Sequence, residues 1–286
     1  MDFNNFNNQN VNSRNSSGTI SQILFGLTLV VVVYLTLLFI EVIYKYINRL
    51  SLNKTVLLGN TYSTDSKTIV IPQNPNVDRS KLVNLSSDER TGIEFSYSFY
   101  LLVNPASFRQ EYGLLHIFHK GYSAQFPLLA PGVYMRSDTN TLRVYMNTYQ
   151  TWNNYVEVEN IPVNKWVHIV VVCKNNALEI FINGNLKKKL SFDGFAPYQN
   201  YQDIVCFSQR RITLKQSLVP SVDENGFDVF GTVKGLVSNL NYYSYAVSYA
   251  EIQALMSEGP SKKMDTTNDS TSVPPYLDDS WWTQGN

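Results

Sequence analysis

The first pattern along the chain is an uninterrupted apolar run. Residues Ile23 to Ile40, ILFGLTLVVVVYLTLLFI, are 18 positions without a charge, and 14 of them are Ile, Leu, Phe or Val. At roughly −0.3 to −0.6 kcal/mol each, these residues contribute about −4 to −8 kcal/mol to membrane insertion. Extended to Ile20–Tyr44, the run is long enough as a helix to cross a bilayer core of about 30 Å. It predicts a transmembrane helix over 20–44, rather than a buried core helix or a cleaved signal peptide.

Polar segments flank this helix. Residues 1–19 are rich in Asn and are expected to be disordered, because they offer little apolar surface to bury. Arg14 precedes the helix, whereas Lys45, Arg49 and Lys54 follow it. The excess of positive charge after the helix predicts that the C-terminal part lies on the cytosolic side. Residues 45–91 are expected to form a juxtamembrane segment and the entry to a folded domain.

From Thr55 onward the pattern changes to short alternating runs separated by turn signals, which predicts an all-β sandwich. In ALEIFI, residues 177–182, alternate positions are apolar, and Asn183-Gly184 then provides the two positive-φ positions of a type I′ hairpin. The expected sandwich covers residues 92–259.

One short helix ends this domain. Ser248 and Glu251 have the spacing of a capping box, and Ile252, Leu255 and Met256 form the apolar stripe behind it. Residues 260–286 are expected to be a flexible tail. Its Trp281-Trp282 pair, beside acidic residues, has the composition of a short docking peptide.

An ordered set of motifs resembles the laminin-G-like, concanavalin A-like jelly roll. The strand NKWVHIVVVC leads into the hairpin LEIFINGN, and the domain ends with GLVSNLNYYSYAVSYAEI. The resemblance covers about 92–260 and implies an antiparallel β-sandwich, here behind an N-terminal transmembrane helix. It extends to membrane-anchored forms of this domain in large DNA viruses, which implies a virion membrane as one home. The matching positions are Lys165, Trp166, His168, Asn183, Gly184, Gly235, Tyr242, Ala246, Ser248, Glu251 and Ile252.

Several buried positions can be predicted from the strands. Trp166 opens a strand in which His168, Val170 and Val172 share its face, and this face is expected to fill the sandwich interior. His116 and His119 are three apart in a strand and are expected to point to opposite faces. The two cysteines, Cys173 and Cys206, are expected to be buried free thiols, although a disulfide between them is the alternative.

Composition excludes some classes of function. The chain has 23 Lys and Arg and 23 Asp and Glu, so no basic field marks a nucleic-acid binder. Three His and two Cys without clustering argue against a transition-metal centre, and no cofactor is expected. Calcium would need several oxygen ligands from adjacent loops, for which Asp138 and the acidic segment from Asp223 are the candidates; solvated acidic loops are the alternative.

Two classes of function stay open. The enzyme alternative is a glycosidase-like protein that uses Glu157 and Glu159, two acids on one strand face without the third acid of related glucanases. The binding alternative uses flat aromatic rings and amides on the strand face opposite Leu142 and Val144, and such groups suit a glycan or a protein ligand. The structural alternative is that these rings only cover the sheet. The candidate ligand-binding residues are Tyr145, Asn147, Tyr149, Trp152, Asn153 and Tyr155.

The sequence therefore predicts a non-catalytic, single-pass membrane protein whose β-sandwich binds a glycan or a protein or has a structural role. No metal site and no nucleic-acid partner are expected.

Overall fold

The computed structural model describes residues 11–47, 49–86, 93–192, 194–215 and 226–265. The chain divides into two compact units at residues 52 and 53. The first contains α1 (Val11–Ile47) and α2 (Arg49–Leu52), and the second contains the strands and α3 (Tyr249–Glu258).

Helix α1 contains the predicted membrane span. Its segment Ile20–Lys45 has a mean hydropathy of 2.8 and is long and apolar enough to cross a membrane. Near its end, Lys45 donates a hydrogen bond to Glu41, with 2.7 Å between Nζ and Oε1. The helix begins at Val11, before the expected start at Ile20, so residues 11–19 continue the helix instead of being disordered. Extending a formed helix costs little per residue, which favours this continuation. Residues 1–10 lie outside the described residues.

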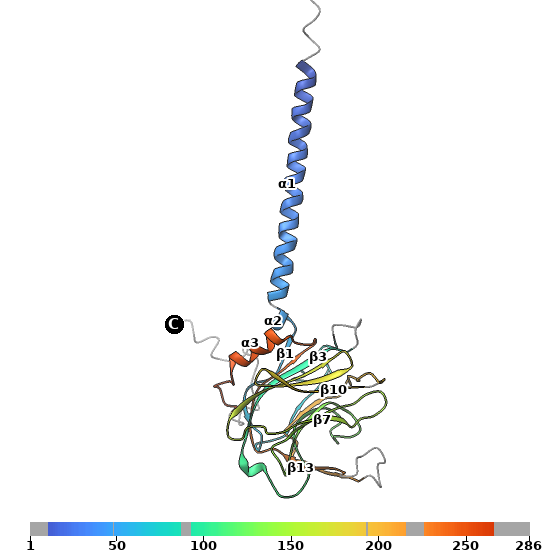
Figure 1. The fold of residues 1–286 in the computed structure, drawn as a ribbon, viewed down its shortest axis with the longest axis vertical. Helices are drawn as coiled ribbons and strands as arrows, with labels where there is room; N and C mark the ends of the chain where they lie inside the picture. The colour runs from blue at the N-terminus through green and yellow to red at the C-terminus, as the bar shows by residue number, and fades with distance from the viewer. Residues whose placement is uncertain (1–10, 48, 87–92, 193, 216–225, 266–286) are drawn as a thin grey trace, which may run out of the picture. The chain divides into compact units, whose positions relative to one another are not determined.

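The second unit is a sandwich of two mostly antiparallel sheets (Figure 1). The six-stranded sheet has the order β1-β14-β3-β8-β9-β10. The eight-stranded sheet has the order β12-β13-β4-β5-β6-β7, with β11 joined to β4 and β2 to β11. The strands are β1 (Lys54–Ser63), β2 (Ile69–Ile71), β3 (Phe95–Val103), β4 (Leu114–Gly121), β5 (Leu129–Arg136), β6 (Leu142–Met146), β7 (Asn154–Val158), β8 (Trp166–Lys174), β9 (Ala177–Ile182), β10 (Asn185–Ser191), β11 (Ile204–Cys206), β12 (Arg211–Leu214), β13 (Phe227–Thr232) and β14 (Gly235–Tyr243). A 3-10 turn, Pro105–Ser107, follows β3.

The core lies between the sheets and consists of alternate apolar residues from both. Phe99 of β3 and Phe118 of β4 meet edge to face across it, with 5.3 Å between ring centroids. Both side chains are fully buried, and each contributes on the order of 2–3 kcal/mol through removal from water. Cys173 and Cys206 are also buried in this core as free thiols, which confirms the prediction, and burial raises the pKa of each to about 12.

The predicted facing of β8 is wrong. Val167, Ile169, Val171 and Cys173 fill the interior, so Trp166, His168, Val170 and Val172 lie on the outer face. There His168 is buried, beside Tyr100, whose hydroxyl donates to carbonyls of α3. Val170 and Val172 on the outer face of β8 are buried as well, so the strand has apolar residues on both faces. A run of β-branched residues then carries no alternation that identifies the inner face.

The hairpin between β9 and β10 and the cap of α3 agree with the sequence. Asn183 and Gly184 have φ of 47° and 76°, as a type I′ turn requires. Ser248 and Glu251 form the predicted capping box at the start of α3. Ile252 and Leu255 are the buried residues of this helix.

The sandwich extends beyond the expected limits of 92 and 259. β1 pairs with β14 from Lys54 onward, so the segment 45–91 includes an edge strand of the six-stranded sheet. After α3, the chain pairs with the outer edge of β1: Thr61 N–H donates to the Lys263 carbonyl at 2.8 Å, and Asp265 N–H donates to the Thr61 carbonyl at 2.8 Å. These bonds cover part of an otherwise open strand edge. The Trp281-Trp282 pair lies outside the described residues.

Candidate functional site

The outer face of the eight-stranded sheet has its own aromatic cluster, separate from the core. Tyr134 of β5 and Tyr145 of β6 meet edge to face at 5.6 Å between ring centroids. Trp152 stacks over Tyr145 at 6.4 Å and contacts Phe227 of β13 at 5.3 Å. All four rings are buried, because they pack against one another and against neighbouring apolar side chains. The cluster therefore forms a rigid aromatic support on a sheet face that faces away from the interior.

A buried arginine links this cluster to the polar groups beside it. Arg143 of β6 is only 3% exposed. Its guanidinium donates to Glu157 Oε1 at 2.9 Å, to the Tyr145 hydroxyl at 3.0 Å and to the Tyr112 hydroxyl at 2.9 Å. It also lies 4.3 Å from the ring centroid of Tyr155. Burial opposes the charge, but the two tyrosines and Glu157 together raise the pKa of Arg143. One cation thus fixes the positions of three tyrosine rings.

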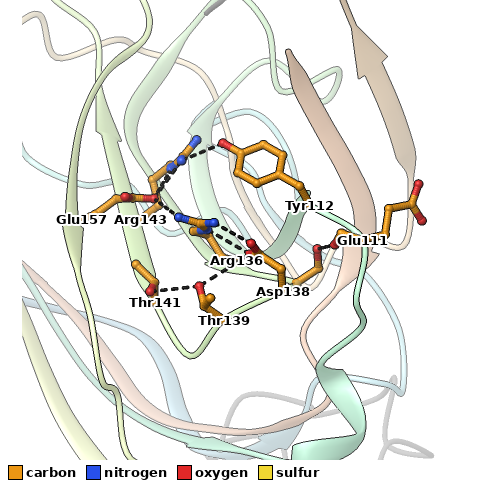
Figure 2. A network of polar contacts seen from close by, with 9 residues as sticks. Glu111, Tyr112, Arg136, Asp138, Thr139, Thr141, Arg143 and Glu157 are labelled. Atoms are coloured by element: carbon orange, nitrogen blue, oxygen red, sulfur yellow. Dashed lines mark hydrogen bonds and ion pairs between the residues drawn. The ribbon is translucent and has the colours of Figure 1, made fainter. Parts of the chain in front are cut away.

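A second arginine extends the network toward the β5–β6 hairpin. Figure 2 shows Arg136 between Asp138 and Glu157. Its Nε and Nη2 atoms donate to the two oxygens of Asp138 at 2.9 and 2.5 Å, and its Nη1 lies 3.7 Å from Glu157 Oε1. The hydrogen bond from Arg136 lowers the pKa of Asp138. The guanidinium lies 5.0 Å from the ring centroid of Tyr112. Tyr112, Arg136, Asp138 and Glu157 are each partly exposed, so this group reaches the surface.

The structure brings together four of the six predicted ligand-binding residues. Tyr145, Trp152, Asn153 and Tyr155 belong to or adjoin the aromatic cluster and the Arg143 network. Tyr145 and Trp152 are 2% and 7% exposed, so they support the surface from below, whereas Tyr155 and Asn153 are partly exposed.

The other two predicted residues lie elsewhere. The Asn147 side chain was expected to face outward, but it is buried and bonds to the Leu129 amide and the Tyr198 carbonyl. Tyr149 is 71% exposed and packs against Tyr198 at 5.2 Å between ring centroids. The strand ends at Met146, so the alternation that was extended to 147 and 149 no longer applies there.

The histidines of β4 also differ from the prediction. His116 and His119 lie on the same outer face, because a bulge places both Ile117 and Phe118 in the core. His119 Nε2 donates to the Tyr122 carbonyl at 2.9 Å, so its Nδ1 accepts from His116 Nε2 at 2.7 Å. The Ser208 amide donates to His116 Nδ1 at 3.0 Å. Both rings are therefore neutral, and all four ring nitrogens have partners.

The two acids of the enzyme alternative lie in different surroundings. Glu159 follows the end of β7 at Val158 and is exposed, whereas Glu157 lies within the strand. Glu157 Oε1 accepts a hydrogen bond from Arg143. Asp138, the other nearby acid, has a lowered pKa.

The calcium candidates are also placed. Asp138 uses both carboxylate oxygens on Arg136, so a cation there would have to displace a guanidinium. Asp223 lies outside the described residues. Over the described ranges, no three His, Cys, Asp or Glu side chains are grouped closely enough to hold a metal ion.

Sequence reasoning did not select Tyr112 and Arg136 as site residues. Tyr112 is in the loop before β4, where no periodicity indicates a direction. Arg136 shares the outer face with Tyr134, and this alternation along GVYMR could have identified it.

A family model that matches the sequence agrees with this fold. The Laminin_G_3 family model, whose description is concanavalin A-like lectin/glucanases superfamily, matches residues 78–253. No curated protein matches the sequence. The binding domain of botulinum neurotoxin serotype G is 16% identical, with a TM-score of 0.45 over 72% of this chain and 42% of that chain. The receptor binding domain of botulinum neurotoxin D is 13% identical, with a TM-score of 0.49 over 72% of this chain and 48% of that chain. The chain thus spans less than half the length of either neurotoxin structure.

The family model covers more than half of the chain and nearly the whole sandwich, from before β3 into α3. The predicted jelly-roll resemblance is confirmed by this match and by the two-sheet architecture. The chain belongs to the concanavalin A-like lectin/glucanases superfamily.

Proposed function

We propose that this protein is a membrane-anchored recognition module that binds a carbohydrate on the outer face of its eight-stranded sheet, without cleaving it. The observation that carries the proposal is the group formed by Tyr112, Tyr155, Arg136, Asp138 and Glu157. Two partly exposed rings lie beside two carboxylates and a guanidinium, and the buried Arg143 fixes the rings.

This combination matches the chemistry of a sugar. The C–H faces of a pyranose pack on flat aromatic rings, and its hydroxyls both donate to carboxylates and accept from guanidinium groups. Arg136 and Arg143 balance Asp138 and Glu157 in charge, so the surface favours a neutral, hydroxyl-rich ligand over a strongly charged one. Rings that are already fixed lose little conformational entropy on binding.

A glycan array with the soluble sandwich, residues 53–265, tests the proposal. Tyr155→Ala should abolish binding to the glycans that the wild type retains, because it removes a stacking ring at the surface. Leu186→Ala is the matched control, since this side chain is 50% exposed on the other sheet. If the wild-type sandwich bound no glycan on the array, the proposal of a carbohydrate ligand would be contradicted, and a protein ligand would be the remaining alternative.

Hydrolysis is a separate test. Incubation of the sandwich with glucans should release no reducing ends. Turnover that Glu157→Gln abolished would establish the glycosidase alternative and contradict binding without cleavage.

The anchor is the segment Ile20–Lys45, and the proposed orientation places the sandwich on the cytosolic side, from the basic residues Lys45, Arg49 and Lys54. Protease added to sealed microsomes should digest the sandwich in this orientation. Protection of the sandwich would contradict it. A virion membrane as the location stays a prediction from the viral forms of the domain.

A further inference from the structure

The exposed aromatic side chains of the sandwich are not scattered. In the part of the sandwich that the structure describes, the most exposed rings are Tyr149 at 71%, Tyr201 at 68%, Tyr249 at 61%, Phe195 at 44% and Tyr122 at 43%. Single exposed apolar side chains are normal on a protein surface, whereas a contiguous group of them marks a contact surface.

One loop shows that these rings share one end of the sandwich. Gln199 donates to the Tyr242 hydroxyl near the end of β14 at 2.8 Å, and Asn200 donates to the Lys120 carbonyl near the end of β4 at 2.9 Å. The Tyr198 amide donates to the Asn147 carbonyl after β6 at 3.0 Å. The ends of β14, β4 and β6 therefore meet at this loop.

Each exposed ring lies next to one of these points. Phe195 and Tyr201 are on the loop itself, and Tyr149 packs on Tyr198. Tyr122 directly follows β4. Tyr249 begins α3, whose leading segment is fixed to the start of β3 by a hydrogen bond from the Val247 amide to Ser96 Oγ at 3.0 Å.

The same end carries the connection to the apolar helix. β1 begins at Lys54, opposite Tyr243 at the end of β14. Lys54 is nine residues after Lys45, where the candidate span ends, so it cannot be more than about 30 Å from that point even in a fully extended chain. Lys174, on the turn between β8 and β9, is exposed at this end as well. We name the surface of Tyr122, Tyr149, Phe195, Tyr201, Tyr249, Lys54 and Lys174 the tethered end.

We propose that the tethered end lies against the bilayer, with its tyrosine and phenylalanine rings in the headgroup region. Amphipathic rings concentrate at the membrane–water interface, and lysines there meet anionic lipid headgroups. The short connection holds this end at high effective concentration near the lipid, so even weak contacts suffice. The candidate glycan site is a different surface, beside the β5–β6 hairpin at Asp138. The inference rests on the proposed membrane anchorage.

Single-cysteine labelling of the full chain in lipid vesicles tests the inference. The native Cys173 and Cys206 are buried and react poorly with maleimide. A fluorophore on Tyr149→Cys or Tyr201→Cys should be quenched by nitroxide-labelled lipid headgroups and shielded from aqueous iodide. The matched control is Thr139→Cys, on the exposed β5–β6 turn at the other end, whose fluorophore should respond in the opposite way.

The outcomes separate this inference from the anchorage on which it rests. Equal lipid quenching at positions 149, 201 and 139 in chains that resist carbonate extraction would overturn the inference alone. Extraction of the full chain by carbonate would overturn the anchorage and the inference together. In a second variant, Tyr149→Ser with Phe195→Ser and Tyr201→Ser, a label at Tyr122→Cys should lose its lipid quenching; unchanged quenching would contradict a role for these rings.

Discussion

Mild acid should destabilise the sandwich through its three buried histidines. Burial and the neighbouring His119 lower the pKa of His116 well below its usual value, and burial lowers the pKa of His119 and of His168 to about 4. The unfolded pKa is 6.5, so the folded state binds fewer protons between pH 6.5 and 4. The stability is therefore fully present above pH 6.5 and is lost as the pH falls toward 4.

The size of the loss follows from proton linkage. Between pH 7.5 and 5.5, a histidine with pKa values of 6.5 unfolded and about 4 folded loses about 1 kcal/mol of stability. His119 and His168 together lose about 2–3 kcal/mol, and His116, whose pKa is also lowered, adds to a loss that is large beside the 5–15 kcal/mol typical of a domain. Protonation of His119 at Nδ1 would also place two N–H groups face to face and break its bond to His116.

Urea unfolding of residues 53–265, followed by tryptophan fluorescence at several pH values, measures this loss. His168→Gln should reduce the loss between pH 7.5 and 5.5 by about 1 kcal/mol. Gln150→His is the control, because an exposed histidine has the same pKa in both states and should leave the loss unchanged. A free energy of unfolding that stays constant over this range, or a loss that His168→Gln does not change, would refute the reasoning.

Three further predictions concern the core, the hairpin and the polar network. Phe99→Ala should lower the free energy of unfolding by about 3–5 kcal/mol, because its cavity lies between two sheets; a loss below about 1 kcal/mol in urea unfolding would contradict the core. Gly184 and Gly194 both have positive φ, so alanine at either position should lower the free energy of unfolding by about 1–2 kcal/mol. Only at position 184 would the added Cβ also lie 2.4 Å from Gln253 Nε2. Gly184→Ala should therefore melt at a lower temperature than Gly194→Ala, and equal melting would contradict this contact. Arg143→Lys should cost about 1–3 kcal/mol and weaken glycan binding, since an ammonium cannot replace the guanidinium bonds to two tyrosines; unchanged affinity in calorimetry would argue against a fixed ring surface.

Local patterns identified much of the fold, because they depend on neighbouring residues alone. Each of three local patterns predicts one local structure, and the structure contains all three: the apolar helix around Ile23–Ile40, the Asn183-Gly184 turn and the Ser248–Glu251 capping box. The family motifs added the sandwich architecture.

The facing of strands could not be derived in the same way. β8 has buried residues on its outer face as well, where Tyr100 of the neighbouring strand bonds to α3, and no local pattern in the sequence shows that this face is covered. A bulge at Ile117 and Phe118 likewise turned His116 and His119 to one face. In both cases, long-range packing decided which side of the strand is inside.

The candidate site was predicted in part for a related reason. Alternation along β6 placed Tyr145 on the outer face, but the partners of Arg143 come from three separate segments. Only sheet pairing brings Glu157 opposite Arg143, and only the loop path brings Tyr112 over them. A polar network assembled from distant segments has no signature in the spacing of its residues.

One experiment measures both the binding of a glycan to the sandwich and the absence of cleavage. A glycan that the sandwich binds on the array is titrated into the soluble sandwich in a calorimeter. The mass of the sugar recovered from the calorimeter cell is then measured by mass spectrometry. Binding without cleavage predicts saturable heat that Tyr155→Ala removes, and a sugar of unchanged mass. Saturable heat that Tyr155→Ala leaves unchanged, or a recovered sugar that has been shortened, would contradict it.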